Sequence, residues 1–213
     1  MGTRKPTALL SAFNKAGLDK FAAGLLACGW DILASAGTAK FLGEKGLRVR
    51  SVSEIVGPPI LGHRVVTLSR ELHAALLAHD IPEDNAELER IGVPRIDLVY
   101  VDLYPLEEAT NQPDATMESV LEMTDIGGPT ILRAARKGGG RMVLCDPTQL
   151  EAALPVIISG GFPTPSRVNE ENTKRWLERF ATIAERRVAD YCLAGFRFAR
   201  QNLGLEVVLP DVV

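Results

Sequence analysis

Apolar runs alternate with amphipathic helical patterns along the first two thirds of the chain. The apolar runs predict strands over residues 7–11, 30–33, 49–52, 96–101 and 142–145. Apolar residues that recur every three or four positions predict helices over residues 18–28, 38–45 and 72–79. This alternation is typical of βαβ units, in which helices cover both faces of a parallel sheet. We therefore expect an α/β three-layer sandwich around a mostly parallel central sheet.

Glycines and prolines mark the ends of several predicted elements. Gly29 and Gly46 directly follow two of the helices, and the segment GPPILGH at residues 57–63 suits a turn better than a helix or strand. The acidic segment DIPEDNAELER, residues 80–90, is interpreted as a solvated excursion. Two further helices are expected, one from about Thr130 and one from Thr148.

The pattern changes from Val168 onward. Apolar side chains there recur at helical spacing over a long segment: Trp176, Leu177, Phe180, Ile183, Ala184, Val188 and Tyr191. A helix with this stripe must pack against the domain's own sheet or against a partner subunit. We expect a single domain over residues 1–213, with an α/β core at about 7–165 and a C-terminal helical segment at 166–200.

Composition narrows the class of protein. The 213 residues are 46% hydrophobic and 24% charged, which favours a soluble globular domain over disorder. A net charge of -3 gives no overall attraction to nucleic acid or to an anionic membrane. No apolar run approaches the length of a membrane span, and the first residues are too soon interrupted for a secretory signal. We therefore expect a cytoplasmic protein.

The cysteines and histidines do not indicate a metal site. Cys28, Cys145 and Cys192 are far apart and form no CxxC pair, and the three histidines have no cysteine partner at metal-ligand spacing. We expect neither a bound metal nor a disulfide framework.

Small polar residues follow the second predicted strand, where a helix begins. Ser35, Gly37 and Thr38 would let the backbone approach a phosphate and would offer hydroxyls and helix N–H groups to it. The alternative, that Ser35 or Thr38 simply caps the helix, is weighed about equally.

Other strand ends carry comparable residues. Ser11, Asn14 and Lys15 follow the first strand, and Asp102 and Tyr104 follow the fourth. Polar residues that converge on one edge of a parallel sheet favour a single pocket there. For Lys15 the alternative, a surface lysine at a helix start, is the commoner role of such a residue.

Two more segments add candidates. Arg64, after the third strand, is a candidate anion contact. The stretch TDIGGPTILRAARK places Asp125 and Lys137 on either side of a glycine-led helix, which would suit an anionic or polar ligand. Its plain interpretation is a loop followed by an amphipathic helix, with Lys137 at the C-terminal end of that helix.

The segments SAFNKAG, SAGTAKFL, RVVTL, DLYPLEE and DIGGPTILRAARK occur in the order and at the spacing of a known domain. Over about residues 7–195 the chain resembles the inosine monophosphate (IMP) cyclohydrolase domain of the bifunctional purine biosynthesis enzyme, whose fold is similar to methylglyoxal synthase. No stretch remains for the transformylase domain that usually follows. The resemblance implies a homodimer, a purine ribotide as small-molecule partner and a separate transformylase.

The resemblance also implies a reaction and residue roles. The carboxamide nitrogen of a formylated aminoimidazole carboxamide ribotide would attack the formyl carbon, and water would be lost to give IMP without a cofactor or metal. Phosphate binding would fall to Lys15, Ser35, Gly37 and Thr38, with Ser11 and Asn14 nearby. The nucleotide would be lined by Arg64, Thr67, Asp102, Ile126 and Gly127. Catalysis would fall to Tyr104, Asp125 and Lys137, with Lys137 as the proton donor and acceptor that faces the other two.

The sequence departs from the family pattern inside this pocket. The family's lysine in RVKTLHP is Val66 and its histidine is Ser69, while Asp102 stands where the family has asparagine. Ala36 and Phe13 are further departures. Either His63, Arg64 or Arg70 replaces the missing cation, or the scaffold has become a purine nucleotide or phosphometabolite binding or regulatory module. Methylglyoxal synthase activity is a third, weaker alternative.

Overall fold

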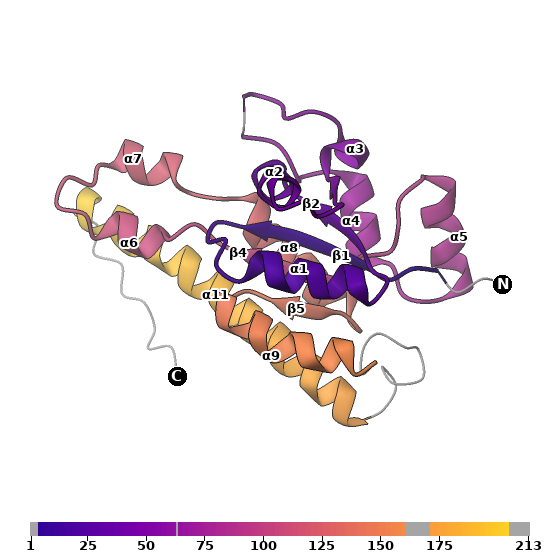
Figure 1. Cartoon of the computed structure of the whole chain (residues 1–213). Coiled ribbons are helices and arrows are strands. Elements are labelled where there is room, and N and C mark those ends of the chain that lie inside the picture. Colours follow the sequence, from indigo (N-terminus) through magenta and orange to yellow (C-terminus); the bar gives the residue numbers. More distant parts are fainter. Residues whose placement is uncertain (1–3, 63, 161–170, 205–213) are drawn as a thin grey trace.

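Five parallel strands form the centre of the computed structural model, which describes residues 4–62, 64–160 and 171–204 (Figure 1). The strands are β1 Thr7–Ala12, β2 Asp31–Ala34, β3 Arg50–Ser51, β4 Leu98–Asp102 and β5 Met142–Leu144. They lie in the order β3-β2-β1-β4-β5, and every pair is parallel. All five therefore end at the same edge of the sheet, as the alternating sequence pattern predicts.

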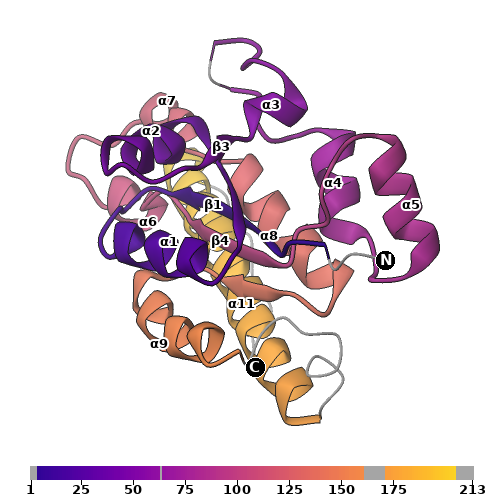
Figure 2. The same ribbon diagram turned by 45° about the vertical axis from the view of Figure 1, so that its right-hand side comes forward.

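Helices connect the strands and cover both faces of the sheet. Those before β4 are α1 Leu18–Ala27, α2 Ala36–Glu44, α3 Ser53–Val56, α4 Arg70–Leu77 and α5 Pro82–Arg90. Those after it are α6 Leu106–Thr110, α7 Met117–Glu122, α8 Gly127–Gly138, α9 Pro147–Ile158 and α11 Glu171–Leu203. In the two views α1 and α9 lie on one side of the strands, and α4 and α8 lie on the other (Figures 1 and 2).

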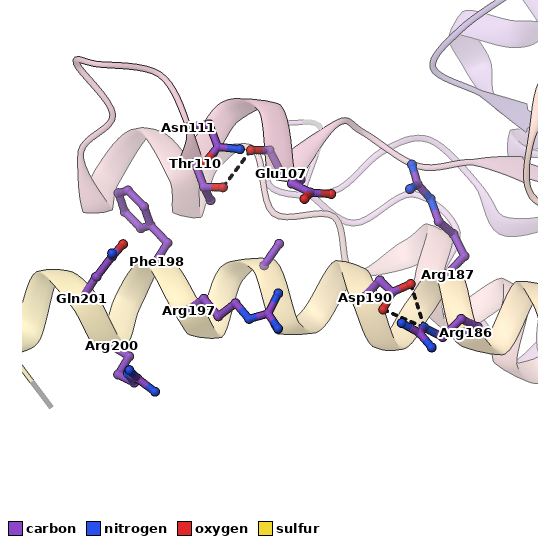
Figure 3. Close-up of a pocket in the computed structure, with 11 residues that line it drawn as sticks. Glu107, Thr110, Asn111, Arg186, Arg187, Asp190, Arg197, Phe198, Arg200 and Gln201 are labelled. Atoms are coloured by element: carbon purple, nitrogen blue, oxygen red, sulfur yellow. Dashed lines mark hydrogen bonds and ion pairs between the residues drawn. The ribbon is translucent and has the colours of Figure 1, made fainter. Parts of the chain in front are cut away.

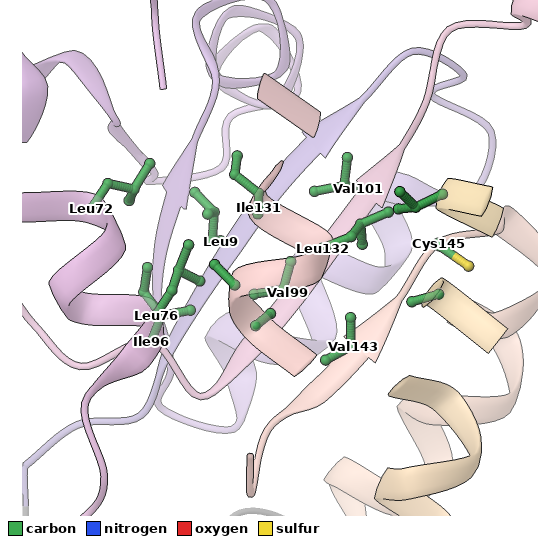
Figure 4. Close-up of a cluster of buried hydrophobic side chains, with 14 of the residues drawn as sticks. Leu9, Leu72, Leu76, Ile96, Val99, Val101, Ile131, Leu132, Val143 and Cys145 are labelled. Carbon is green, nitrogen blue, oxygen red and sulfur yellow. The ribbon is translucent and has the colours of Figure 1, made fainter. Parts of the chain in front are cut away.

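Strand residues alternate between two hydrophobic clusters, one on each face. Leu9, Val99 and Val143 point into a cluster with α4, α8 and α11 (Figure 4). Leu10 and Tyr100 point into the opposite cluster, with α1 and α9. Because successive side chains of a strand face opposite ways, a sheet buried on both faces needs apolar residues at nearly every position. The expected three-layer α/β sandwich is confirmed.

The long helix α11 serves both clusters. Its Leu177 and Phe180 belong to the cluster with α1 and α9, whereas Ala184, Val188 and Tyr191 belong to the cluster with α4 and α8. The apolar stripe therefore covers the domain's own sheet, one of the two expected alternatives. Val168, from which the stripe was expected to begin, lies outside the described residues, and the described helix begins at Glu171.

The acidic segment at residues 80–90, expected to be a solvated excursion, is a largely exposed helix. It forms α5, in which Leu88 is buried. Pro82 is at the start of the helix, Glu83 and Asp84 are in its first turn, and Arg90 is in its last turn. This order suits the helix dipole and explains why so polar a segment is helical.

Other boundaries also differ from the predictions. Helix α2 begins two residues before Thr38, and α8 begins three residues before Thr130. Strand β3 pairs only over Arg50–Ser51, because it is the edge strand and ends directly at α3. Helices α3, α6 and α7 were not predicted, since each is at most six residues long.

Charged residues at the opposite edge of the sheet are bonded to one another and to backbone carbonyls. The carboxylate of Asp97 accepts hydrogen bonds from Arg4, at 2.6 and 2.7 Å, and from Arg95. The buried Arg141 donates to the carbonyls of Ile96 and Gly139, each at 2.8 Å. Burial lowers the pKa of Arg141 to about 9, and the nearby Arg95 adds to this effect. Arg141 also donates to the carbonyl of Ala75 in α4 at 3.4 Å, so these groups join α4 to the segments that lead into β4 and β5 and have a structural role.

Candidate functional site

Three hydroxyl groups join the ends of β1 and β2 to the start of α2. The Ser11 hydroxyl donates to the Ser35 hydroxyl at 3.1 Å, and the Ser35 hydroxyl donates to Thr38 Oγ1 at 3.2 Å. Thr38 Oγ1 also accepts the backbone N–H of Ala12 at 3.1 Å. The two strand ends are thus held together by side chains that the sequence placed in one pocket.

The start of α2 is not capped by a side chain. Ser35 occupies the N-cap position, yet its hydroxyl makes no hydrogen bond to the first backbone N–H groups of the helix. A Cβ built on Gly37 meets no atom within 4 Å, so the first turn faces open space. Free N–H groups at the positive end of a helix attract anions. The capping alternative for Ser35 and Thr38 is therefore not what the structure shows.

Lys15 lies in the loop after β1 and bonds to that loop. Its amine donates to the carbonyl of Ala12 and, at 3.2 Å, to the carbonyl of Phe13. Partial burial lowers the pKa of Lys15, although the nearby Asp102 opposes this shift. The amine would have to leave these two carbonyls to reach a ligand at α2.

Asp102 ends β4 beside the same loop. Its Oδ2 accepts the backbone N–H of Asn14 at 2.7 Å, and its carbonyl accepts the N–H of Phe13 at 3.2 Å. Burial raises the pKa of Asp102, and the positive charges of Arg187 and Lys15 partly oppose that shift. Asp102 is therefore a structural acceptor for the β1 loop as well as a half-buried charge in the site.

Tyr104 packs against the loop after β1, with its ring tilted relative to that of Phe13. Its ring centroid lies 5.1 Å from that of Phe13, and 44% of Tyr104 is exposed. Tyr104 also lines a cavity of about 240 Å³ with Arg187 and Tyr191 of α11. The long C-terminal helix thus supplies part of the wall beside Tyr104.

Asp125 organises the start of α8. Its Oδ1 accepts the N–H of Gly127 at 2.9 Å, and its Oδ2 accepts the N–H of Gly128 at 3.0 Å. Burial raises the pKa of Asp125, while these two N–H groups oppose the shift. A Cβ on Gly127 would lie 2.5 Å from Thr67 Oγ1, so Thr67 is packed directly against this turn. The structure therefore brings Thr67, Asp125 and Gly127 together, with the exposed Ile126 between the last two.

Lys137 is not brought to Tyr104 and Asp125 within this chain. It is exposed in the last turn of α8, the helix whose first turn Asp125 caps. A helix rises by about 1.5 Å per residue, so ten residues separate its ends by about 15 Å. The expectation that Lys137 faces the other two candidate residues is not met, because α8 runs away from the edge where they lie.

Two of the three candidates for the missing cation, Arg64 and Arg70, are exposed around the loop before α4. Arg64 is exposed and donates from Nε to the carbonyl of Leu61 at 3.1 Å. Val66 packs against the cluster with α4 and α8, and Ser69 caps α4 by accepting the N–H of Leu72 at 3.0 Å. Arg70 is exposed at the first position of α4. The remaining candidate, His63, lies outside the described residues.

Two residues of α11, Arg187 and Tyr191, contribute to the site although no sequence pattern placed them there. The N–H of Asp125 donates to the Tyr191 hydroxyl at 2.6 Å, and that hydroxyl donates to the carbonyl of Met123 at 3.3 Å. Arg187 lies one turn earlier on α11, close enough to Asp102 to affect its pKa. Helical periodicity identified Tyr191 as a core residue, but no local signal links it to a loop 66 positions away.

The described residues offer little other reactive chemistry. They contain no group of three His, Cys, Asp or Glu side chains that could hold a metal ion. Burial raises the pKa of the Cys145 thiol to about 11, so it is protonated at neutral pH and is a poor nucleophile. Within the same residues, no helix is both long and apolar enough to cross a bilayer. The site consists of hydroxyls, backbone N–H groups, Lys15 and two carboxylates, which suits binding of a polar anion and proton transfer.

Comparison with protein families gives a match to the MGS-like domain over residues 17–130. The chain is 46% identical over 151 residues to the bifunctional purine biosynthesis protein PurH of Thermosynechococcus vestitus, covering 69% of this chain and 29% of that protein. It is 38% identical over 192 residues to PurH of Desulfitobacterium hafniense, covering 89% of this chain and 36% of the relative. The chain therefore spans about a third of the length of the curated relatives it matches.

A solved structure has a similar fold over nearly its whole length. The crystal structure of ForH superposes with a TM-score of 0.75 at 31% sequence identity. The match covers 91% of this chain and 97% of that one. Taken with the family match and the PurH relatives, this places the present chain in the MGS-like domain family, among the domains related to PurH.

Proposed function

We propose that the chain is an IMP cyclohydrolase, which closes the ring of a formylated aminoimidazole carboxamide ribotide with loss of water. The single observation that carries this proposal is the uncapped, open start of α2 beside the Ser11, Ser35 and Thr38 hydroxyls. The similarity of the chain to PurH proteins supports a purine ribotide as the ligand. A ribotide phosphate is the kind of anion that such a helix start attracts.

The main requirement of this reaction is that the two reacting groups are held in the correct relative position. Both reacting groups belong to one molecule, so holding the reactive rotamer removes much of the entropic barrier. The enzyme must also stabilise charge on the formyl oxygen and move protons. No metal or cofactor is required by this chemistry.

We assign phosphate binding to the first turn of α2, with Ser35, Gly37 and Thr38, and to Lys15 once its amine leaves the loop carbonyls. Ser11 and Asn14 would complete that end of the site. The base would lie toward Thr67, Asp102 and the turn of Asp125, Ile126 and Gly127. Tyr104 is exposed and would orient the carboxamide or assist proton transfer.

Helix α11 offers a candidate for the positive charge that the family's lysine would supply. Arg187 lines the cavity beside Tyr104, and its charge affects Asp102. We propose that Arg187, rather than Arg64 or Arg70, supplies positive charge where the family has the lysine that is Val66 here. We assign no proton-transfer step to Lys137. Its exposed position in the last turn of α8 supports only an interaction with the C-terminal end of that helix.

A binding or regulatory module for purine nucleotides is the second candidate function. Two observations favour it: Val66 is packed against the core, and Lys137 lies at the far end of α8. Methylglyoxal synthase activity has less support, because the carboxylate that would act as its base, Asp125, already accepts two backbone N–H groups.

The decisive experiment is spectrophotometric conversion of the formylated ribotide to IMP by the purified wild type. Turnover is expected, with a large loss in Arg187→Met and little change in Lys137→Ala. A well-folded wild type that binds IMP without turnover would establish the binding module instead. Loss of turnover in Lys137→Ala would mean that another chain brings this lysine to the site.

Three further expectations rest on the same relatives. We infer that the protein works as a homodimer, that a separate transformylase supplies its substrate, and that it is cytoplasmic. Sedimentation of the purified chain tests the first of these directly, since a single species of monomer mass would contradict it.

A further inference from the structure

A second cavity, of about 620 Å³, lies between α6 and α11 (Figure 3). Its volume is within the range of roughly 300–1,000 Å³ that is typical of small-molecule sites. It adjoins the smaller cavity at Tyr104, with which it shares Glu107, Asn111, Arg187, Asp190 and Ala194. The part that extends toward the end of α11 is lined by Arg197, Arg200 and Gln201, none of which is assigned to the proposed cyclohydrolase site.

Arginines dominate the wall that α11 forms. Arg186, Arg187, Arg197 and Arg200 line the cavity, against only two acidic residues, Glu107 and Asp190. Arg186 Nε already donates to both carboxylate oxygens of Asp190, at 2.8 and 2.9 Å. The cavity therefore has more positive charge than its own acids balance.

Two of these arginines make no ion pair within 4 Å with any described residue, namely Arg187 and Arg197. In Figure 3 the Arg187 side chain points away from the Arg186 and Asp190 pair. Like charges gathered along one helix face repel one another, so a ligand that neutralises them gains free energy.

The two walls are fixed to each other. Leu106 of α6 and Phe198 of α11 are both buried, and a Cβ on Gly195 would lie 3.6 Å from Leu106 Cδ2. Figure 3 shows Thr110, the last residue of α6, and Asn111, which follows it, opposite the arginine-bearing helix. The cavity is thus formed by packed elements and offers amide and hydroxyl groups opposite its cations.

We propose that the cavity between α6 and α11 binds a small phosphorylated organic molecule with at least two negative charges, at a site separate from the start of α2. Guanidinium groups bind phosphate through paired N–H donors, and a phosphorylated ligand with two negative charges matches the two arginines that have no ion pair among the described residues better than a single carboxylate does. Asn111 and Gln201 would hydrogen-bond the organic part of the ligand.

Calorimetric titration with pyrophosphate tests the site. Saturable binding is expected in the wild type and should weaken at least tenfold in Arg197→Met. The matched control is Arg179→Met, since Arg179 is also exposed on α11 but lines neither cavity. Ser35→Ala, altered at the start of α2, should retain this binding. Circular dichroism should show that all variants remain folded.

The opposite results would overturn the proposal. Absence of saturable binding, or equal weakening in Arg179→Met and Arg197→Met, would mean that the arginines act only as a diffuse positive surface. Loss of binding in Ser35→Ala alone would assign the pyrophosphate to the start of α2. Citrate that binds as tightly as pyrophosphate would contradict the preference for phosphate. These results do not depend on cyclohydrolase turnover.

Discussion

Glycines at the two helix starts of the site differ in what surrounds them. A Cβ on Gly128 would lie 2.4 Å from Asp125 Oδ2 and 2.6 Å from Leu103 Cδ2, so a larger residue at the start of α8 would have to displace these side chains. Gly37 at the start of α2 has no atom within 4 Å of such a Cβ. Packing therefore explains Gly128. Gly37 is better explained by the close approach of a ligand phosphate to the protein backbone.

We predict that Gly37→Ala separates binding from stability. Alanine suits a helix better than glycine, so the free energy of unfolding should be unchanged or rise by up to about 1 kcal/mol. A methyl group over the first turn should weaken IMP binding about tenfold or more, which equals about 1.4 kcal/mol. Calorimetric titration with IMP and urea unfolding measure the two effects.

Gly43→Ala is the control for this change. Gly43 is also in α2, has open space around a Cβ and lies near the other end of the helix. It should show the same gain in stability with unchanged IMP binding. Equal binding in Gly37→Ala and the wild type would place the ligand elsewhere.

Asp102→Asn should change how stability depends on pH. Burial raises the pKa of Asp102, so the folded state keeps its proton to higher pH than the unfolded chain does. The folded wild type therefore loses stability as the pH rises from about 4, the ordinary value, through the folded pKa. Asparagine has no such proton, and its oxygen still accepts the N–H of Asn14.

The stability of Asp102→Asn relative to the wild type should therefore increase between about pH 4 and pH 7. Urea unfolding at several pH values measures this difference. A difference that does not vary with pH would mean that Arg187 and Lys15 fully compensate the burial of the carboxylate.

At the scale of elements, α11 fixes the turn that leads into α8. The Tyr191 hydroxyl accepts the N–H of Asp125 and donates to the carbonyl of Met123. Tyr191→Phe should therefore cost about 1–3 kcal/mol, because a partly buried N–H loses its acceptor. It should also lower turnover, since Asp125 is no longer held in place.

Tyr104→Phe is the matched control for stability. Tyr104 is exposed, and its hydroxyl makes no hydrogen bond to the part of the chain that the structure describes. Its loss should change the free energy of unfolding by less than about 0.5 kcal/mol. Thermal unfolding that ranks the two variants the other way would contradict the role of Tyr191.

Some helices and strands were predicted from the sequence pattern and others were not. Buried strands such as β1 and β4 were predicted because short, continuous apolar runs are typical of strands that are covered on both faces. Helix α5 was missed although its Pro82 and terminal charges are helix signals, because its apolar face is reduced to one buried residue. The short α6 and α7 have too few residues for a periodic pattern.

The candidate site was predictable where it follows local rules. Strand ends of a parallel sheet meet at one edge, so Ser11, Ser35 and Asp102 could be grouped from the sequence. Arg187 could not be grouped with them, because its position depends on how α11 crosses the sheet. The expected place of Lys137 came from resemblance alone, and the length of α8 contradicts it within one chain.

At the scale of the whole molecule, α11 links the two hydrophobic clusters on opposite faces of the sheet. Its Phe180 packs with the cluster of α1 and α9, and its Ala184 and Val188 pack with the cluster of α4 and α8. An element shared by both clusters should make them unfold together. We therefore propose that the core and the C-terminal helix form one cooperative domain, with no stable core in the absence of α11.

Ala184→Asp tests this proposal. Ala184 is fully buried, so a carboxylate there should cost several kcal/mol and should lower the whole transition. The control is Ala189→Asp, because Ala189 is exposed on the same helix and should tolerate the charge. Circular dichroism and tryptophan fluorescence should report one shared transition in each protein. An early loss of helical signal in Ala184→Asp, with the rest unfolding as in the wild type, would show instead that α11 detaches from an independently stable core.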